Sequence, residues 1–150
     1  STINPFHYAS KHNNKHILWM KHTPTGETAH SNKVYYPQKD DGTKIKGYNT
    51  TYKRICWNKP CYTITMANGS ISSQNNVHPG RLLDDGTYSD ARVLTIYEII
   101  LLTGLDDRWS HLIKQYKDKT NLSDNKIRQL IGESFPPKFC FHIFKTLPIS

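Results

Sequence analysis

Cysteine and histidine side chains are the groups in this sequence that could act as nucleophiles or metal ligands. His12 and His16 stand one helical turn apart, and Cys56 and Cys61 lie within reach of a single loop. Structural zinc sites commonly use two closely spaced ligand pairs. The sequence has no pair of cysteines separated by two residues, so we predict free thiols and no bound metal.

No motif for independent catalysis is present in the sequence. Gly-x-Ser-x-Gly, the turn that exposes a serine nucleophile, does not occur. The glycines are spread singly, so neither a phosphate-binding loop nor a Gly-x-Gly turn is formed. We therefore predict no catalytic residue in this chain.

The charge of the chain favours a polyanionic partner. Among 150 residues there are 20 Lys and Arg against 12 Asp and Glu, giving a formal net charge of +8. Lys53, Arg54 and Arg81 are candidates for contacts with DNA phosphates, and Arg54 has the donor geometry to address guanine. Binding of this kind weakens as salt concentration rises.

A cluster of amide side chains is the best candidate for reading base edges. Gln74, Asn75 and Asn76 each carry a donor and an acceptor, the combination that adenine presents in the major groove. The alternative is a loop whose amides cap their own backbone.

The length and composition of the chain limit the number of domains it can form. With 36% hydrophobic residues, the chain can fill one modest domain or two small lobes. It has no apolar stretch long enough to cross a membrane. Three cysteines, an odd number, and no leader-like start favour a cytoplasmic protein. Because the sequence begins with Ser1 instead of methionine, we expect a portion of a longer protein or a subunit of a split enzyme.

The elements that must position these groups differ between the two parts of the chain. Residues 1–90 are polar and rich in turn signals, and Thr- and Tyr-rich runs predict strands at 48–52 and 62–66. Asn68-Gly69 could close a hairpin. We expect a strand-and-loop lobe here.

Residues 91–150 carry helix signals. Thr95 and Glu98 have the spacing of a capping box, and Gly104 suits the end of that helix. A loop is expected at 106–109, a second helix after Ser123, and a third after Pro136, with apolar residues at helical spacing along it. The predicted fold class is therefore α+β, with a lobe at 1–90 and a helical segment at 91–150.

Three segments, in this order, resemble the C-terminal portion of DNA cytosine-5 methyltransferases of restriction-modification type. Trp57–Thr65 is similar to the W-x-x-P-x-x-T-I-T segment near the end of the target-recognition region. Arg92–Asp107 resembles the ninth conserved motif, although Ile96 and Asp106 replace the usual prolines. Gln129–Pro137 resembles the tenth motif.

The resemblance implies a function for the complete enzyme. Members of this family transfer a methyl group from S-adenosyl-L-methionine (AdoMet) to C5 of a cytosine flipped out of double-stranded DNA. It implies that Thr63 bonds the DNA backbone near the flipped nucleotide. It also implies AdoMet contacts by three residues, of which the first departs from the family's asparagine: Glu133, Ser134 and Phe135.

The chemical part of the enzyme is expected outside this chain. The family's nucleophile lies in Pro-Cys-Gln, whereas Cys61 follows Pro60 but precedes Tyr62. The glycine-rich donor loop has no counterpart in the sequence either. The partners predicted are therefore DNA and a catalytic domain or large subunit. The alternative is a non-catalytic basic module that binds nucleic acid.

Overall fold

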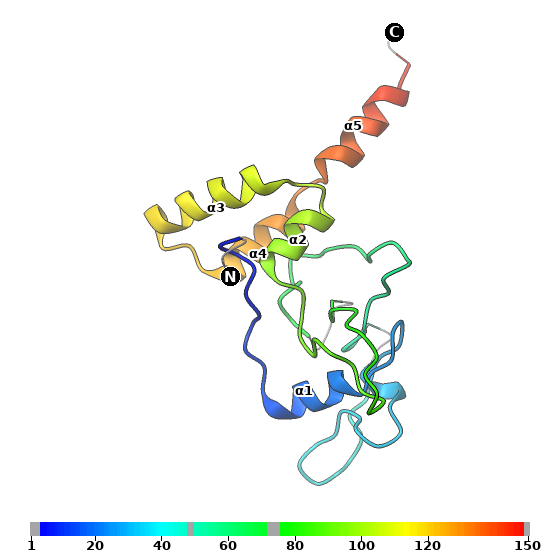
Figure 1. Cartoon of the computed structure of the whole chain (residues 1–150). Helices are drawn as coiled ribbons and strands as arrows, with labels where there is room; N and C mark the ends of the chain where they lie inside the picture. Colours follow the sequence, from blue (N-terminus) through cyan, green and yellow to red (C-terminus); the bar gives the residue numbers. More distant parts are fainter. Residues whose placement is uncertain (1–3, 48–49, 72–75, 149–150) are drawn as a thin grey trace. The chain divides into compact units, whose positions relative to one another are not determined.

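The computed structural model describes residues 4–47, 50–71 and 76–148. The chain forms two compact units (Figure 1). The loop unit comprises Ala9–Thr63 and Ala67–Leu94. The helical unit comprises Ser1–Tyr8, Ile64–Met66 and Thr95–Ser150. Two short pieces of the first 90 residues thus belong to the helical unit.

The loop unit contains little regular structure. Helix α1 (Asn14–Lys21) begins where Asn13 accepts hydrogen bonds from the backbone N–H groups of Lys15 and His16, at 2.7 and 3.3 Å. A 3₁₀ turn, η1, spans Ala29–Ser31. Two tight loops are closed by the isolated bridges Gln38–Lys44 and Leu82–Tyr88.

The described residues form none of the predicted strands. Residues 50–52 make a turn and 62–66 are irregular, and residues 48 and 49 lie outside the described part. Residues 66–69 form a turn, and among the residues that the structure describes there are isolated β-bridges but neither a hairpin after this turn nor a strand. The α+β class is therefore not confirmed. Propensity for a pleated surface made no strand here because backbone groups of this unit pair across loops instead.

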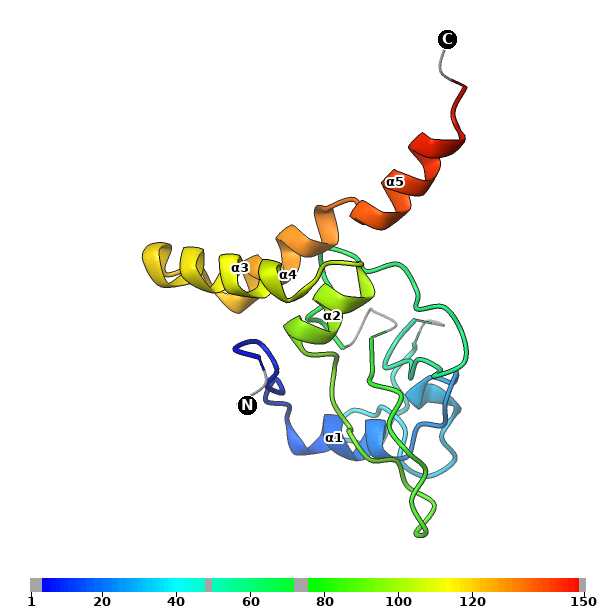
Figure 2. The ribbon, with the colours of Figure 1, turned by 45° about the horizontal axis from the view of Figure 1, so that its top comes forward.

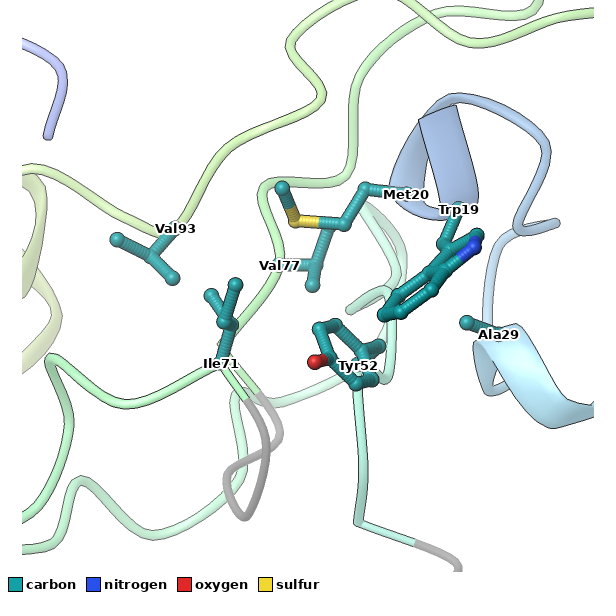
Figure 3. Close-up of a cluster of buried hydrophobic side chains, with 7 residues drawn as sticks. All are labelled: Trp19, Met20, Ala29, Tyr52, Ile71, Val77 and Val93. Carbon is teal, nitrogen blue, oxygen red and sulfur yellow. The ribbon is translucent and has the colours of Figure 1, made fainter. Parts of the chain in front are cut away.

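A small apolar core holds the loop unit together. Trp19 and Met20 of α1 lie in one buried cluster with residues from distant loops (Figure 3). The ring centroids of Trp19 and Tyr52 are 5.5 Å apart, in an edge-to-face arrangement. The other members of the cluster are Ala29, Ile71, Val77 and Val93.

The helical unit contains α2 (Ile96–Leu102), α3 (Asp107–Thr120), α4 (Asp124–Glu133) and α5 (Pro137–Thr146). The capping box at the start of α2 is confirmed: Glu98 N–H donates to Thr95 Oγ1 at 3.1 Å, and Thr95 N–H donates to Glu98 Oε2 at 2.7 Å. Gly104 lies past its end with φ +77°, as predicted. The helices after Ser123 and Pro136 are also confirmed.

Helix α3 was not predicted from the sequence. The expected loop at 106–109 is instead a helix start, where Asp106 Oδ1 accepts from the Arg108 N–H at 3.1 Å. The helix ends at Thr120, and its C-cap Asn121 adopts the left-handed conformation with φ 52°. An Asp N-cap and an Asn C-cap were therefore the signals that mattered.

Residues 4–8 complete the helical unit. Tyr97 N–H donates to the Phe6 carbonyl at 3.3 Å, and the Tyr8 hydroxyl donates to Asp124 Oδ2 at 2.6 Å. Asp124 also pairs with Lys117. These contacts join the first residues to α2 and α4. Among the described residues, no helix is both long and apolar enough to span a membrane.

Candidate nucleic-acid interface

Arg54 lies at the centre of the loop unit, with 0% of its surface exposed. Its Nε donates to the Thr23 carbonyl at 2.8 Å, and its Nη2 donates to the Met20 carbonyl at 2.6 Å. Nη1 donates to the His78 carbonyl and, at 3.5 Å, to the Ser89 carbonyl. One guanidinium group therefore fixes the end of α1 and two later loops.

This burial corrects the predicted role of Arg54. Desolvation lowers its pKa to about 10, which is still far above neutral pH, so the group stays charged. The Tyr88 ring lies 4.8 Å from the guanidinium carbon. Because its donors serve backbone carbonyls inside the unit, Arg54 is placed to organise the fold and not to address guanine.

The two other basic residues predicted to bind DNA lie nearer the surface. Arg81 is exposed, and its backbone N–H donates to Ser89 Oγ at 2.9 Å. Lys53 is half-buried, and its Nζ lies 5.0 Å from the centroid of the Tyr62 ring. Both belong to the loop unit, and Arg81 is open to a phosphate.

The predicted base-reading loop is only partly described. Gln74 and Asn75 lie outside the described residues. Asn76 is 3% exposed, and its Nδ2 donates to the Asn68 carbonyl and, at 3.3 Å, to the Ser70 carbonyl. Asn76 therefore caps neighbouring backbone, as in the alternative reading of this loop.

Thr63 and Cys61 lie in the irregular segment after Pro60. Thr63 is exposed. Cys61 is half-buried, with its Sγ 3.2 Å from the Tyr62 carbonyl oxygen, and burial raises the pKa of the thiol. A raised pKa leaves the thiol protonated at neutral pH, whereas a nucleophile must be a thiolate. The microenvironment of Cys61 is therefore that of an unreactive cysteine.

The three residues assigned to AdoMet lie at the C-terminal end of α4. Glu133 Oε1 accepts from Gln129 Nε2 at 2.8 Å, and Ser134 Oγ donates to the Ile131 carbonyl at 2.7 Å. Phe135 is 81% exposed. A carboxylate and an open aromatic ring can receive a ribose hydroxyl and an adenine ring. These residues suit one wall of an AdoMet site but do not enclose one.

Gly132, just before them, packs against backbone. A Cβ at this position would lie 2.1 Å from the Thr65 carbonyl oxygen and 2.5 Å from the Met66 nitrogen. Only glycine permits this approach. The tenth-motif-like segment therefore touches the end of the T-I-T segment within the helical unit.

The helical unit also presents apolar surface. A groove of about 370 Å³ lies between α3 and α4. Helix α5 has no buried residue and extends away from α2, α3 and α4 (Figures 1 and 2). Its exposed side chains include Phe139, Ile143 and Phe144. The groove is lined by Trp109, Leu112, Ile113, Tyr116, Leu122, Ile127, Leu130 and Ile131.

Trp57 is an exposed aromatic residue of the loop unit to which the sequence reasoning gave no role of its own. The residue is 69% exposed, yet its Nε1 donates to the Gly80 carbonyl at 2.7 Å. The partner lies 23 positions away along the chain, so no local pattern could have identified the bond. In the part of the chain that the structure describes, no three Cys, His, Asp or Glu residues are grouped to hold a metal.

Comparison with known proteins assigns the family. The family model for C-5 cytosine-specific DNA methylases matches residues 1–148. The chain is 53% identical over 142 residues to the Type II methyltransferase M1.HgaI of Avibacterium volantium. The aligned region is 95% of this chain but 38% of that relative, so the chain spans well under half of its length. This chain belongs to the C-5 cytosine-specific DNA methylase family.

Proposed function

We propose that this chain is the DNA-recognition and C-terminal portion of a DNA (cytosine-5)-methyltransferase of a restriction-modification system. One observation carries the proposal: the family match runs from residue 1 to 148, while the sequence holds neither Pro-Cys-Gln nor a glycine-rich donor loop. The relative M1.HgaI is a Type II methyltransferase of which the matched region is 38%. The remaining length of such a protein has room for the catalytic motifs.

In this proposal the loop unit grips double-stranded DNA. The net charge of +8 attracts the phosphate backbone, and the exposed Arg81 offers a direct contact. Lys53 supplies a second charge near Tyr62. Thr63 lies between Lys53 and Arg81 in the sequence, within the segment that resembles the recognition region, and it is exposed. We propose that it bonds a phosphate near the flipped cytosine. Such contacts offset the few kcal/mol, roughly, that base flipping costs.

The helical unit is proposed to dock on the catalytic portion. The apolar face of α5 and the groove between α3 and α4 leave large side chains exposed, and soluble proteins seldom expose contiguous apolar surface without a partner. The partner proposed is the AdoMet-binding portion of the same enzyme. Restoration of methyl transfer when the two portions are combined tests this docking.

AdoMet is the proposed cofactor of the complete enzyme, to which it supplies the methyl group. Glu133, Ser134 and Phe135 are the residues of this chain proposed to contact it. Phe135 is open for a ring contact, and the Glu133 carboxylate is exposed and can accept another hydrogen bond. These three residues can form only one side of an AdoMet site, so the glycine-rich loop of the other portion must complete it.

Salt dependence tests the DNA-binding role. The complete enzyme, with this chain joined to the catalytic portion, should bind a duplex with a Kd that rises steeply with salt. Arg81→Ala should flatten the slope of log Kd against log salt by about 1, because one phosphate contact is lost. Asp84→Ala, in the same exposed loop, is the control and should not flatten it. A Kd that does not change with salt concentration would contradict the proposal.

A further inference from the structure

We infer that Trp57 contacts the DNA directly, by packing the exposed face of its indole against the sugar–phosphate backbone of the duplex. The inference rests on the proposed function and adds a contact residue to it. Trp57 lies in the loop unit, and the residue is 69% exposed to solvent. A tryptophan exposed to this extent presents a large apolar surface for a partner.

The indole is held in one orientation. Nε1 donates to the Gly80 carbonyl at 2.7 Å, and the His78 ring meets the indole edge-on at a centroid distance of 5.5 Å. With its only polar atom bonded inside the unit, the ring leaves apolar faces for binding. A side chain that is already ordered also loses less conformational entropy when it binds.

The hydrogen bond that anchors the Trp57 indole depends on Gly80 and on the buried Arg54. Gly80 has φ +62°, and a Cβ there would lie 2.3 Å from the Ser89 carbonyl oxygen and 2.8 Å from Arg54 Nη1. Arg54 fixes the His78 and Ser89 carbonyls on either side. Arg54 is therefore a positioning residue, because it holds the loop that holds Trp57.

Charge around the anchor favours a nucleic acid over a protein. Arg81 directly follows Gly80 and is exposed, and Lys59, two positions after Trp57, is exposed as well. Two acidic residues near Arg81 in the sequence are engaged: Asp90 Oδ1 accepts from Arg92 Nε at 3.3 Å, and Asp85 Oδ1 accepts from the Thr87 N–H at 2.9 Å. An exposed apolar ring on a unit that also carries exposed cations suits the sugar–phosphate backbone of DNA.

Binding of a mixed-sequence DNA duplex to the complete enzyme, followed by fluorescence anisotropy, tests the inference. Contacts with the sugar–phosphate backbone carry no sequence information, so no target site is required. Trp57→Ala should raise Kd about tenfold, because the apolar contact is lost. Trp57→Phe, which keeps an aromatic ring but loses the bond to Gly80, should raise it about threefold. Val34→Ala, at a residue of the same unit that is 70% exposed, is the matched control and should leave Kd unchanged.

The salt slope separates a direct contact from a structural effect. In Trp57→Ala the slope should equal that of the unchanged protein, because an apolar contact neutralises no phosphate and releases no counterions, whereas Arg81→Ala should flatten it by about 1. An unchanged Kd in Trp57→Ala, or a flattened slope, would overturn the inference. Weaker joining to the catalytic portion with unchanged DNA binding would assign Trp57 to a protein contact and overturn it too. Failure of the unchanged protein to bind DNA would instead refute the proposed function.

Discussion

Replacing Arg54 with methionine should lower the free energy of unfolding of the chain by about 3 kcal/mol, because buried carbonyl oxygens lose a charged donor. Four carbonyls of the loop unit, those of Met20, Thr23, His78 and Ser89, accept from this one guanidinium. Methionine fills much of the volume but offers no donor. The apolar core alone cannot replace these bonds.

Urea denaturation measures the effect of Arg54→Met. Arg81→Met, the same change at an exposed arginine of the same unit, is the control and should alter the unfolding free energy by less than about 0.5 kcal/mol. Equal stability of the two variants would show that Arg54 is not the organising group of the loop unit.

Replacing Gly132 with alanine should destabilise the helical unit by about 2 to 3 kcal/mol. The added Cβ would stand 2.1 Å from the Thr65 carbonyl oxygen and 2.3 Å from the Thr65 carbonyl carbon. Both atoms are backbone, so no side-chain rotation relieves the clash. The sign of this change in stability is informative, because alanine in a helix is ordinarily favoured over glycine by about 1 kcal/mol.

Thermal unfolding of Gly132→Ala checks this expectation. Lys126→Ala, on the same helix at an exposed position, is the control and should leave the melting temperature nearly unchanged. A variant as stable as the unchanged protein, or more stable, would mean that α4 does not lie against Thr65 as described. The same clash should displace the T-I-T segment, so DNA binding should weaken as well.

Local signals predicted the helices better than the loop unit. Thr95 and Ser123 each cap a helix start with their own side chains, and the prolines 136 and 137 mark the start of α5 without a side-chain cap. Helix α3 was missed although Asp106 caps it in the same way. In the loop unit, the fold depends on bonds between distant segments, such as those from Arg54, and composition alone predicted strands that the described residues do not contain.

For the candidate site, too, some features could be predicted from the sequence and others depended on tertiary structure. The family resemblance was identified from segment order, and the family is confirmed. Roles of single residues were harder to predict, because Arg54 and Asn76 have DNA-binding side chains by type but are buried. Burial of a polar side chain depends on the backbone acceptors that tertiary structure brings to it. Trp57 was left without a role because its anchor, Gly80, is remote in sequence.

Methyl transfer from labelled AdoMet to duplex DNA is the most direct test of whether this chain binds the DNA while another portion of the enzyme carries the catalytic residues. The chain alone should transfer no methyl group, and activity should appear when it is combined with a polypeptide that bears Pro-Cys-Gln and the glycine-rich loop. Cys61→Ser in this chain should keep the combined rate within about twofold, because Cys61 lies outside a Pro-Cys-Gln context and burial raises the pKa of its thiol, so we expect the nucleophile in the other portion. Turnover by the chain alone, or loss of the combined activity in Cys61→Ser, would contradict the account.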